Sequence, residues 1–131
     1  MKKLFIDDER YPPNTRWYHF ISWPFTGRLN GWVVRRTYDS TIAWLNAQAS
    51  GPAYVSFDND IQDPQDRQGY HIAQWMVERD MDMEGKYLPD VFEFCVHSQN
   101  SVRAHGNTSI SWYLNDYLEK KYGNFFEWSK S

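Results

Sequence analysis

The stretch that most constrains the fold of this chain is Tyr54-Val55-Ser56-Phe57-Asp58-Asn59-Asp60. Its short apolar run, bounded by Gly51-Pro52 and by a polar stretch downstream, predicts a buried strand. The side chains of Asp58 and Asp60 point the same way if the strand continues through both, and separate if the chain turns at Asp58. Acidic residues at the end of a buried strand are typical of active or metal sites in α/β proteins. A simple polar turn explains them equally well.

The N-terminus repeats this pattern. Lys3-Leu4-Phe5-Ile6 predicts a brief strand, and Asp7-Asp8-Glu9-Arg10 follows it directly. Two adjacent carboxylates repel each other unless they are solvated or bound to a cation, which favours a functional role for Asp7 and Asp8. Two strands that end in carboxylates therefore suggest one shared site.

The rest of the chain predicts alternating strands and helices. An aromatic-rich excursion without helical period covers residues 11–31. The remaining predicted elements are a strand at 32–38, a helix from Asp39 or Ser40 to about Ala49, the strand that begins at Tyr54, a loop from Ile61 to Arg67, a helix from Gln68-Gly69 to about Asp80, a strand at 91–96 and a helix from about Asn107 to Lys121.

Alternation of this kind predicts an α/β protein with right-handed βαβ units and a central, mostly parallel sheet. We expect a flavodoxin-like three-layer fold with four to five strands in the order 2-1-3-4(-5). In that order the first and third predicted strands are neighbours, so their carboxyl ends bring Asp7, Asp8 and Asp58 around one point. His97-Ser98, which follows the fourth predicted strand, lies beside them.

Composition limits the function classes. A chain of 131 residues predicts one domain spanning 1–131, and a net charge of −3 argues against general nucleic-acid coating. The single cysteine, Cys95, lies in an apolar run and predicts a structural, buried thiol. The apolar start of the chain is too short for a signal peptide, and no segment approaches membrane-spanning length, so we expect a cytoplasmic protein without membrane contact.

Four motifs resemble a known family. They are Asp7-Asp8-Glu9-Arg10, Ser56-Phe57-Asp58-Asn59-Asp60-Ile61, Gly69-Tyr70 and His97-Ser98-Gln99-Asn100. Their layout resembles a response-regulator receiver domain, in which Asp7-Asp8 would match the magnesium-binding pair, Asp58 the phosphoacceptor position and Ser98 the hydroxyl residue after the fourth strand. The combination is more closely similar to the cyclic-phosphate processing receiver domain family, over nearly the whole chain. This resemblance implies a receiver-like fold and a metal-assisted phosphoesterase that acts on cyclic phosphates of nucleotides or nucleic-acid ends.

The chain departs from the family pattern at two positions. The family has histidine where this chain has Asn59, and usually proline where this chain has Ser101. An asparagine does not transfer protons near neutral pH, so an acid-base role of that histidine is absent here. The lysine of a fifth receiver strand also has no clear counterpart, which disfavours ordinary phosphorelay signalling.

The favoured hypothesis is a hydrolase. Asp7, Asp8, Asp58 and Asp60 would bind Mg²⁺ or Mn²⁺, since carboxylate oxygens suit such ions. We expect Asp58 and His97 to be catalytic, with His97 protonating a leaving oxygen, although a structural, hydrogen-bonded histidine is an equal alternative. Arg10, Ser98 and Asn100 would hold phosphate oxygens.

The alternative hypothesis is a non-catalytic, possibly phage-encoded binding protein that captures a protein partner or nucleotide through aromatic side chains. Its contact surface would be formed by Trp17, Trp23, Phe125, Phe126 and Trp128. The replacement at Asn59 favours this alternative. The sequence leaves the substrate, the partner and the oligomeric state open.

Overall fold

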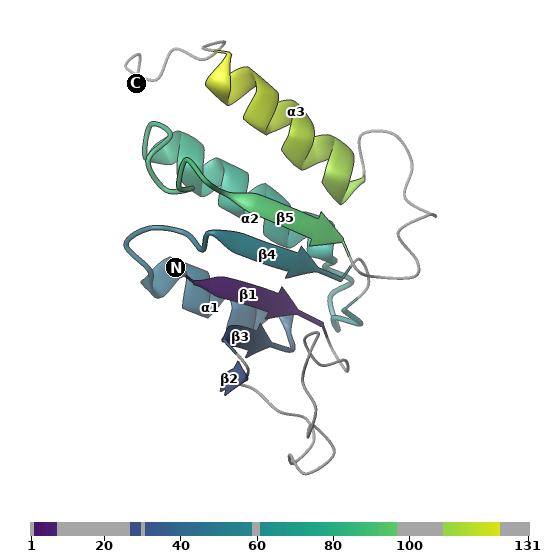
Figure 1. The fold of residues 1–131 in the computed structure, drawn as a ribbon. Helices are drawn as coiled ribbons and strands as arrows, with labels where there is room; N and C mark the ends of the chain where they lie inside the picture. Colours follow the sequence, from purple (N-terminus) through teal and green to yellow (C-terminus); the bar gives the residue numbers. More distant parts are fainter. Residues whose placement is uncertain (1, 8–26, 30, 59–60, 97–108, 124–131) are drawn as a thin grey trace.

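The computed structural model describes residues 2–7, 27–29, 31–58, 61–96 and 109–123. These residues form a five-stranded sheet in the order β2-β3-β1-β4-β5, with three helices (Figure 1). The strands are β1 Lys3–Ile6, β2 Gly27–Leu29, β3 Trp32–Arg35, β4 Tyr54–Phe57 and β5 Glu93–Val96, and the helices are α1 Tyr38–Ala47, α2 Gly69–Asp82 and α3 Ile110–Tyr122.

Four of the strands are parallel. β1 pairs with β3 on one side and with β4 on the other, and β4 pairs with β5. The predicted order 2-1-3-4 of the parallel strands and the α/β class are therefore confirmed. The short strand β2 was not predicted; it pairs antiparallel with β3 and forms one edge of the sheet.

Helices α1 and α3 begin at residues whose side chains accept a hydrogen bond from a backbone amide of the first helical turn. Thr37 caps α1, because its hydroxyl accepts a hydrogen bond from the Ser40 amide at 3.1 Å. The prediction that Asp39 or Ser40 caps this helix was therefore wrong by about two residues. Gly69 opens α2 as predicted, and Ser109 caps α3. Gly123 ends α3, also as predicted.

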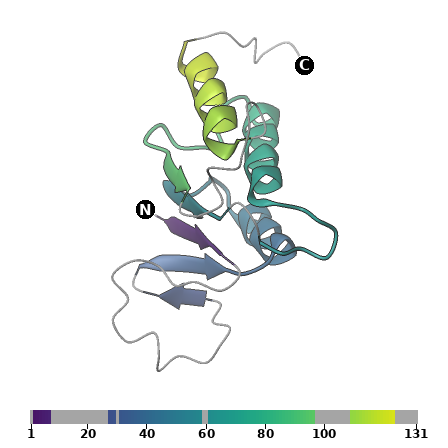
Figure 2. The ribbon, with the colours of Figure 1, turned by 90° about the vertical axis from the view of Figure 1, so that its right-hand side faces the viewer.

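One face of the sheet is packed against helices. Both α1 and α2 lie on this face, as the view along the sheet shows (Figure 2). The core between the layers contains Leu4, Ile6, Val55 and Phe57 from the strands, with Leu45, Ile72, Met76 and Leu114 from the helices. The stripe at Ile72, Ala73, Met76 and Val77 is buried as predicted.

On the opposite face, Phe5, Trp32 and Val34 form a second buried cluster. The rings of Phe5 and Trp32 meet edge to face, with their centroids 5.7 Å apart. A third layer on this face stays a prediction, because residues 8–26 lie outside the description.

A buried carboxylate joins α2 to α3. Asp80 is fully buried, and it accepts hydrogen bonds from the amides of Tyr87 and Leu88 and from the Tyr117 hydroxyl. Its second oxygen also lies 3.0 Å from Nζ of Lys121 in α3. These partners satisfy the charge of Asp80 inside the protein and hold α3 against α2. Within the described ranges, no helix has the length and apolar character needed to cross a bilayer.

Candidate active site at the carboxyl ends of the strands

Asp7 and Asp58 follow two neighbouring parallel strands, β1 and β4. Phe5 and Ser56 are partners across this pair, and each aspartate lies two residues further along its strand. Because side chains alternate between faces, this spacing places the two aspartates at equivalent positions at one edge of the sheet. Asp7 is fully buried, and Asp58 is 5% exposed. Two carboxylates withdrawn from solvent at one strand end need positive charge nearby.

Arg36 brings such a charge to this edge. It comes directly after β3, the other neighbour of β1, and its side chain is almost fully buried. Its Nη1 donates a hydrogen bond to the backbone oxygen of Asp7 at 3.1 Å. The sequence reasoning missed Arg36. The available signal was its position two residues after the buried Val34, since the same spacing identifies Asp7 after Phe5 and Asp58 after Ser56.

The first residue of α2 lies against the backbone of Asp58. A Cβ atom added to Gly69 would stand 2.0 Å from the carbonyl oxygen of Asp58, which no side chain tolerates. The absence of a side chain at Gly69 therefore lets the start of α2 approach the end of β4. The amide groups of the first helical turn carry partial positive charge, which favours anions near this end of the helix.

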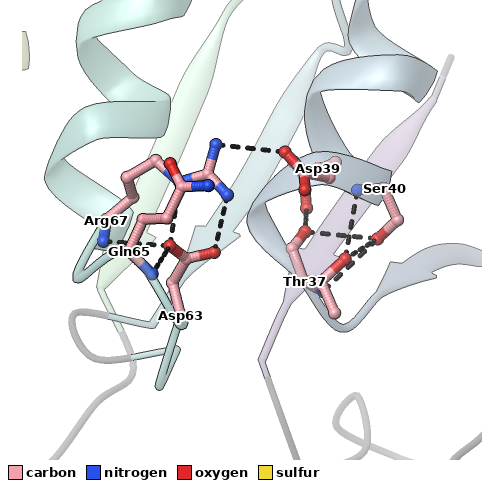
Figure 3. Close-up of polar contacts among 7 residues, drawn as sticks. Thr37, Asp39, Ser40, Asp63, Gln65 and Arg67 are labelled. Atoms are coloured by element: carbon pink, nitrogen blue, oxygen red, sulfur yellow. Dashed lines mark hydrogen bonds and ion pairs between the residues drawn. The ribbon is translucent and has the colours of Figure 1, made fainter.

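The loop from β4 to α2 is tied to α1 by an arginine (Figure 3). The guanidinium of Arg67 bonds both carboxylate oxygens of Asp63, at 2.8 and 3.0 Å, and lies 3.1 Å from the carboxylate of Asp39. It also stacks on the ring of Tyr38, 4.2 Å from the ring centroid. This arrangement, the Arg67 clamp, holds the loop that leads from Asp58 to Gly69 against the first turn of α1.

The Arg67 clamp also fixes the charge state of Asp63. Hydrogen bonds from the Arg67 side chain, aided by the amides of Gln65 and Arg67, lower the pKa of Asp63 to about 2. The same pairing raises the pKa of Arg67 above its ordinary value. Asp63 is therefore an ionised structural carboxylate.

The remaining predicted site residues lie outside the description. These are Asp8, Arg10, Asp60, His97, Ser98 and Asn100, together with Asn59 and the aromatic residues Trp17, Trp23, Phe125, Phe126 and Trp128. Across the part of the chain that the structure describes, no three His, Cys, Asp or Glu side chains form a group that could hold a metal ion. Two of the four predicted metal ligands, Asp7 and Asp58, belong to this part, so the four-carboxylate metal site stays a prediction.

Comparison with known proteins identifies the family. A family model described as the cyclic-phosphate processing receiver domain matches residues 2–109, which include all five strands. No curated protein and no solved structure matches the chain. The match covers most of the sequence, and its region carries the parallel sheet and both aspartates at the strand ends. The chain therefore belongs to the family of cyclic-phosphate processing receiver domains.

Proposed function

We propose that this protein is a divalent-metal-dependent phosphoesterase that acts on cyclic phosphates of nucleotides or nucleic-acid ends. The observation that carries the proposal is the placement of Asp7 and Asp58, two buried carboxylates at the ends of adjacent parallel strands. The family's description as a processor of cyclic phosphates supports the choice of substrate. Clefts at the carboxyl ends of parallel strands are the usual binding sites of α/β proteins.

The chemistry of the donor atoms fits a hard cation. Asp7 and Asp58 supply carboxylate oxygens, the ligands that Mg²⁺ and Mn²⁺ prefer, and Asp8 and Asp60 are the further ligands that we propose. When bound, such an ion neutralises phosphate charge and lowers the pKa of a bound water molecule. Arg36 holds the backbone of Asp7, which restricts the direction in which the Asp7 carboxylate can point.

The other proposed roles belong to side chains that bind phosphate or move a proton. Arg10, Ser98 and Asn100 donate hydrogen bonds to the phosphate oxygens of the substrate. His97 protonates the leaving oxygen when the cyclic ester opens, because its ordinary pKa lies near 6.5. Because Asn59 stands in place of the family's histidine, we assign this proton transfer to His97.

The Asp58→Asn variant tests this function. Removing the charge of Asp58 while keeping its shape should abolish Mn²⁺-dependent hydrolysis of 2′,3′-cyclic nucleotides, because the asparagine amide is a much weaker ligand for a hard cation. The measurement is the rate of monophosphate release with and without Mn²⁺.

The matched control is Asp82→Asn, which removes one charge from an exposed position near the end of α2. We expect its rate to equal that of the unaltered protein. Equal hydrolysis by the Asp58→Asn and unaltered proteins contradicts the proposal. Failure of the folded, unaltered protein to hydrolyse any cyclic phosphate with any divalent ion also contradicts it, and favours a binding protein instead.

A further inference from the structure

An open groove lies between strand β5 and helix α3. It has a volume of about 570 Å³, within the range of about 300–1,000 Å³ that is usual for small-molecule sites. Strand β5 is the edge of the sheet opposite β2, and no described strand pairs with its outer side. Figure 1 shows α3 displaced past this edge, so the strand and the helix form two walls of the groove.

The lining of the groove combines apolar surfaces with exposed polar groups. Phe92 and Phe94 supply two stacked aromatic rings, with centroids 6.3 Å apart, and Leu118 lines the groove from α3. The exposed polar side chains are those of Glu93, Ser111 and Asn115. The described lining includes no lysine or arginine, and the carboxylate of Glu93 repels other anions. The groove therefore suits an uncharged group with a flat apolar face and hydrogen-bonding edges, and it disfavours a phosphate.

The backbone of β5 adds a donor and an acceptor to the groove. The amide of Glu93 donates to the carbonyl of Ala53 at 2.9 Å, so the peptide groups of Glu93 point toward β4. Because these groups alternate in direction along a strand, the N–H and C=O groups of Phe94 point outward, into the groove. A nucleobase also carries a donor beside an acceptor on its Watson–Crick edge. The edge of a base therefore matches the free backbone edge at Phe94.

One end of the groove adjoins the candidate active site. Cys95 lines the groove, and its register partner in β4 lies two residues before Asp58. The spacing and rise of neighbouring strands place the Cα atoms of Cys95 and Asp58 about 8 Å apart. On the helix side, Ser111 lines the groove, and the preceding Ile110 lies against Gly69, with its Cδ1 only 3.1 Å from the place of a Cβ there. Since the backbone of Gly69 contacts that of Asp58, both walls of the groove begin beside the site.

We propose that this groove is the nucleobase subsite of the candidate active site, and that the substrates are cyclic phosphates that carry a nucleoside. The ribose bridges the gap between the phosphate beside Asp58 and the base in the groove. The edge of the base pairs with the backbone of Phe94, one of its faces packs on Leu118 and the ring of Phe94, and Asn115 hydrogen-bonds its edge. The inference rests on the proposed function for the place of the phosphate, whereas binding of the base does not require turnover.

Substrates with and without a base test the subsite. With Mn²⁺ present, we expect kcat/KM for adenosine 2′,3′-cyclic phosphate to exceed that for methyl riboside 2′,3′-cyclic phosphate, which lacks a base, by at least about tenfold. The Asn115→Ala variant should lower kcat/KM for the nucleotide by about threefold to tenfold, because one hydrogen bond to the base is lost. It should leave kcat/KM for the base-free substrate unchanged. Asn115 is exposed, so its replacement should not disturb folding.

Asn46→Ala is the matched control. It removes the same kind of side chain from an exposed position on α1, outside the groove, so kcat/KM for both substrates should stay at the values of the unaltered protein. Equal kcat/KM for the two substrates in the unaltered protein overturns the subsite and leaves the phosphoesterase activity standing. An equal loss in the Asn115→Ala variant for the substrates with and without a base also overturns it, because such a loss does not depend on the base.

Nucleoside binding without turnover separates the subsite from the activity. Adenosine at millimolar concentration, added to the metal-free protein, should shift the NMR signals of the Phe94 backbone amide and the Asn115 side-chain amide, whereas ribose should not. The side-chain amide of Asn46 is the internal control. If these shifts appear in a protein that hydrolyses no cyclic phosphate, the proposed function fails and the subsite stands. Absence of shifts at both Phe94 and Asn115 overturns the subsite.

Discussion

At the site, the backbone of Gly69 lies close against the backbone of Asp58. The carbonyl oxygen of Asp58 occupies space that any side chain at position 69 would need. Gly69 therefore sets how closely α2 approaches the end of β4, and through this contact it helps to position the Asp58 carboxylate.

The Gly69→Ala variant should be destabilised and impaired. Its new methyl group would stand 2.0 Å from the Asp58 carbonyl, so either the helix or the strand end must move. Overpacking of this kind costs about 1–3 kcal/mol of unfolding free energy. We also expect a lower rate of cyclic-phosphate hydrolysis, because the Asp58 carboxylate moves with its backbone. Urea unfolding and the hydrolysis assay measure the two effects.

Gly123→Ala is the matched control for this variant. Gly123 ends α3 with φ of −88°, a conformation that every residue adopts, and it is exposed. We expect a stability within about 0.5 kcal/mol of the unaltered protein, as for most surface substitutions. Equal stabilities of the Gly69→Ala and Gly123→Ala variants would show that the close contact does not constrain the site.

At the scale of single residues, the sequence predicted those site residues that stand out as charges directly after an apolar strand. Asp7 and Asp58 stand out because charged residues directly follow apolar runs. Arg36 obeys the same rule, but the neighbouring Arg35 makes the pair resemble an exposed, charged strand end. Only the register with β1 shows that Arg36 is buried beside Asp7.

Between elements, the Arg67 clamp is the polar link from the β4–α2 loop to α1. Its three carboxylate contacts involve Asp63 and Asp39, and its planar guanidinium also covers the ring of Tyr38. Arginine suits this role because its fork of donors matches a carboxylate in two places at once.

The contribution of the Arg67 clamp to stability should depend on pH. Asp63 has a pKa of about 2 in the folded protein against an ordinary 3.8, so its ionised form favours folding. This contribution is complete at pH values above the pKa that Asp63 has in the unfolded chain. It disappears as the pH falls through the pKa that Asp63 has in the folded protein. We expect the gap in melting temperature between the unaltered protein and Asp63→Asn to be widest above about pH 5 and to close toward pH 2.

Asp116→Asn is the control for this titration. It disrupts an exposed ion pair between Asp116 and Lys120 on α3, and such pairs contribute about 0.3–0.5 kcal/mol. Its melting temperature should stay close to that of the unaltered protein at every pH. A gap for Asp63→Asn that stays constant, or widens on acidification, would contradict the assigned role of the clamp.

Elements with strong apolar patterns were predictable and those with weak patterns were not. The apolar stripe of α2 and the apolar runs of β1 and β4 indicate which of their residues are buried, and the sequence places these three elements correctly. Strand β2 has three residues, Gly27-Arg28-Leu29, without such a pattern, and it exists through its pairing with β3. For the start of α1 the sequence suggested Asp39 or Ser40 as the cap, whereas Thr37, which the prediction placed in the preceding strand, has this role.

Across the whole molecule, parallel topology creates the site. Because β3, β1 and β4 run in one direction, the residues that follow them meet at one edge although they lie far apart in the chain. Arg36, Asp7 and Asp58 arrive there from three different segments. The strand order could be predicted from the alternation of strands and helices, which is why the placement of Asp7 near Asp58, although not that of Arg36, followed from the sequence.

The most direct test of the central claim is Mn²⁺ anomalous diffraction from crystals soaked with the ion and a cyclic nucleotide. The account predicts a single strong peak about 2.1 Å from carboxylate oxygens of Asp7 and Asp58, and its loss in Asp58→Asn crystals soaked in the same way. Ordered Asp7 and Asp58 carboxylates with no peak beside them, or an equal peak in the Asp58→Asn crystals, would contradict it.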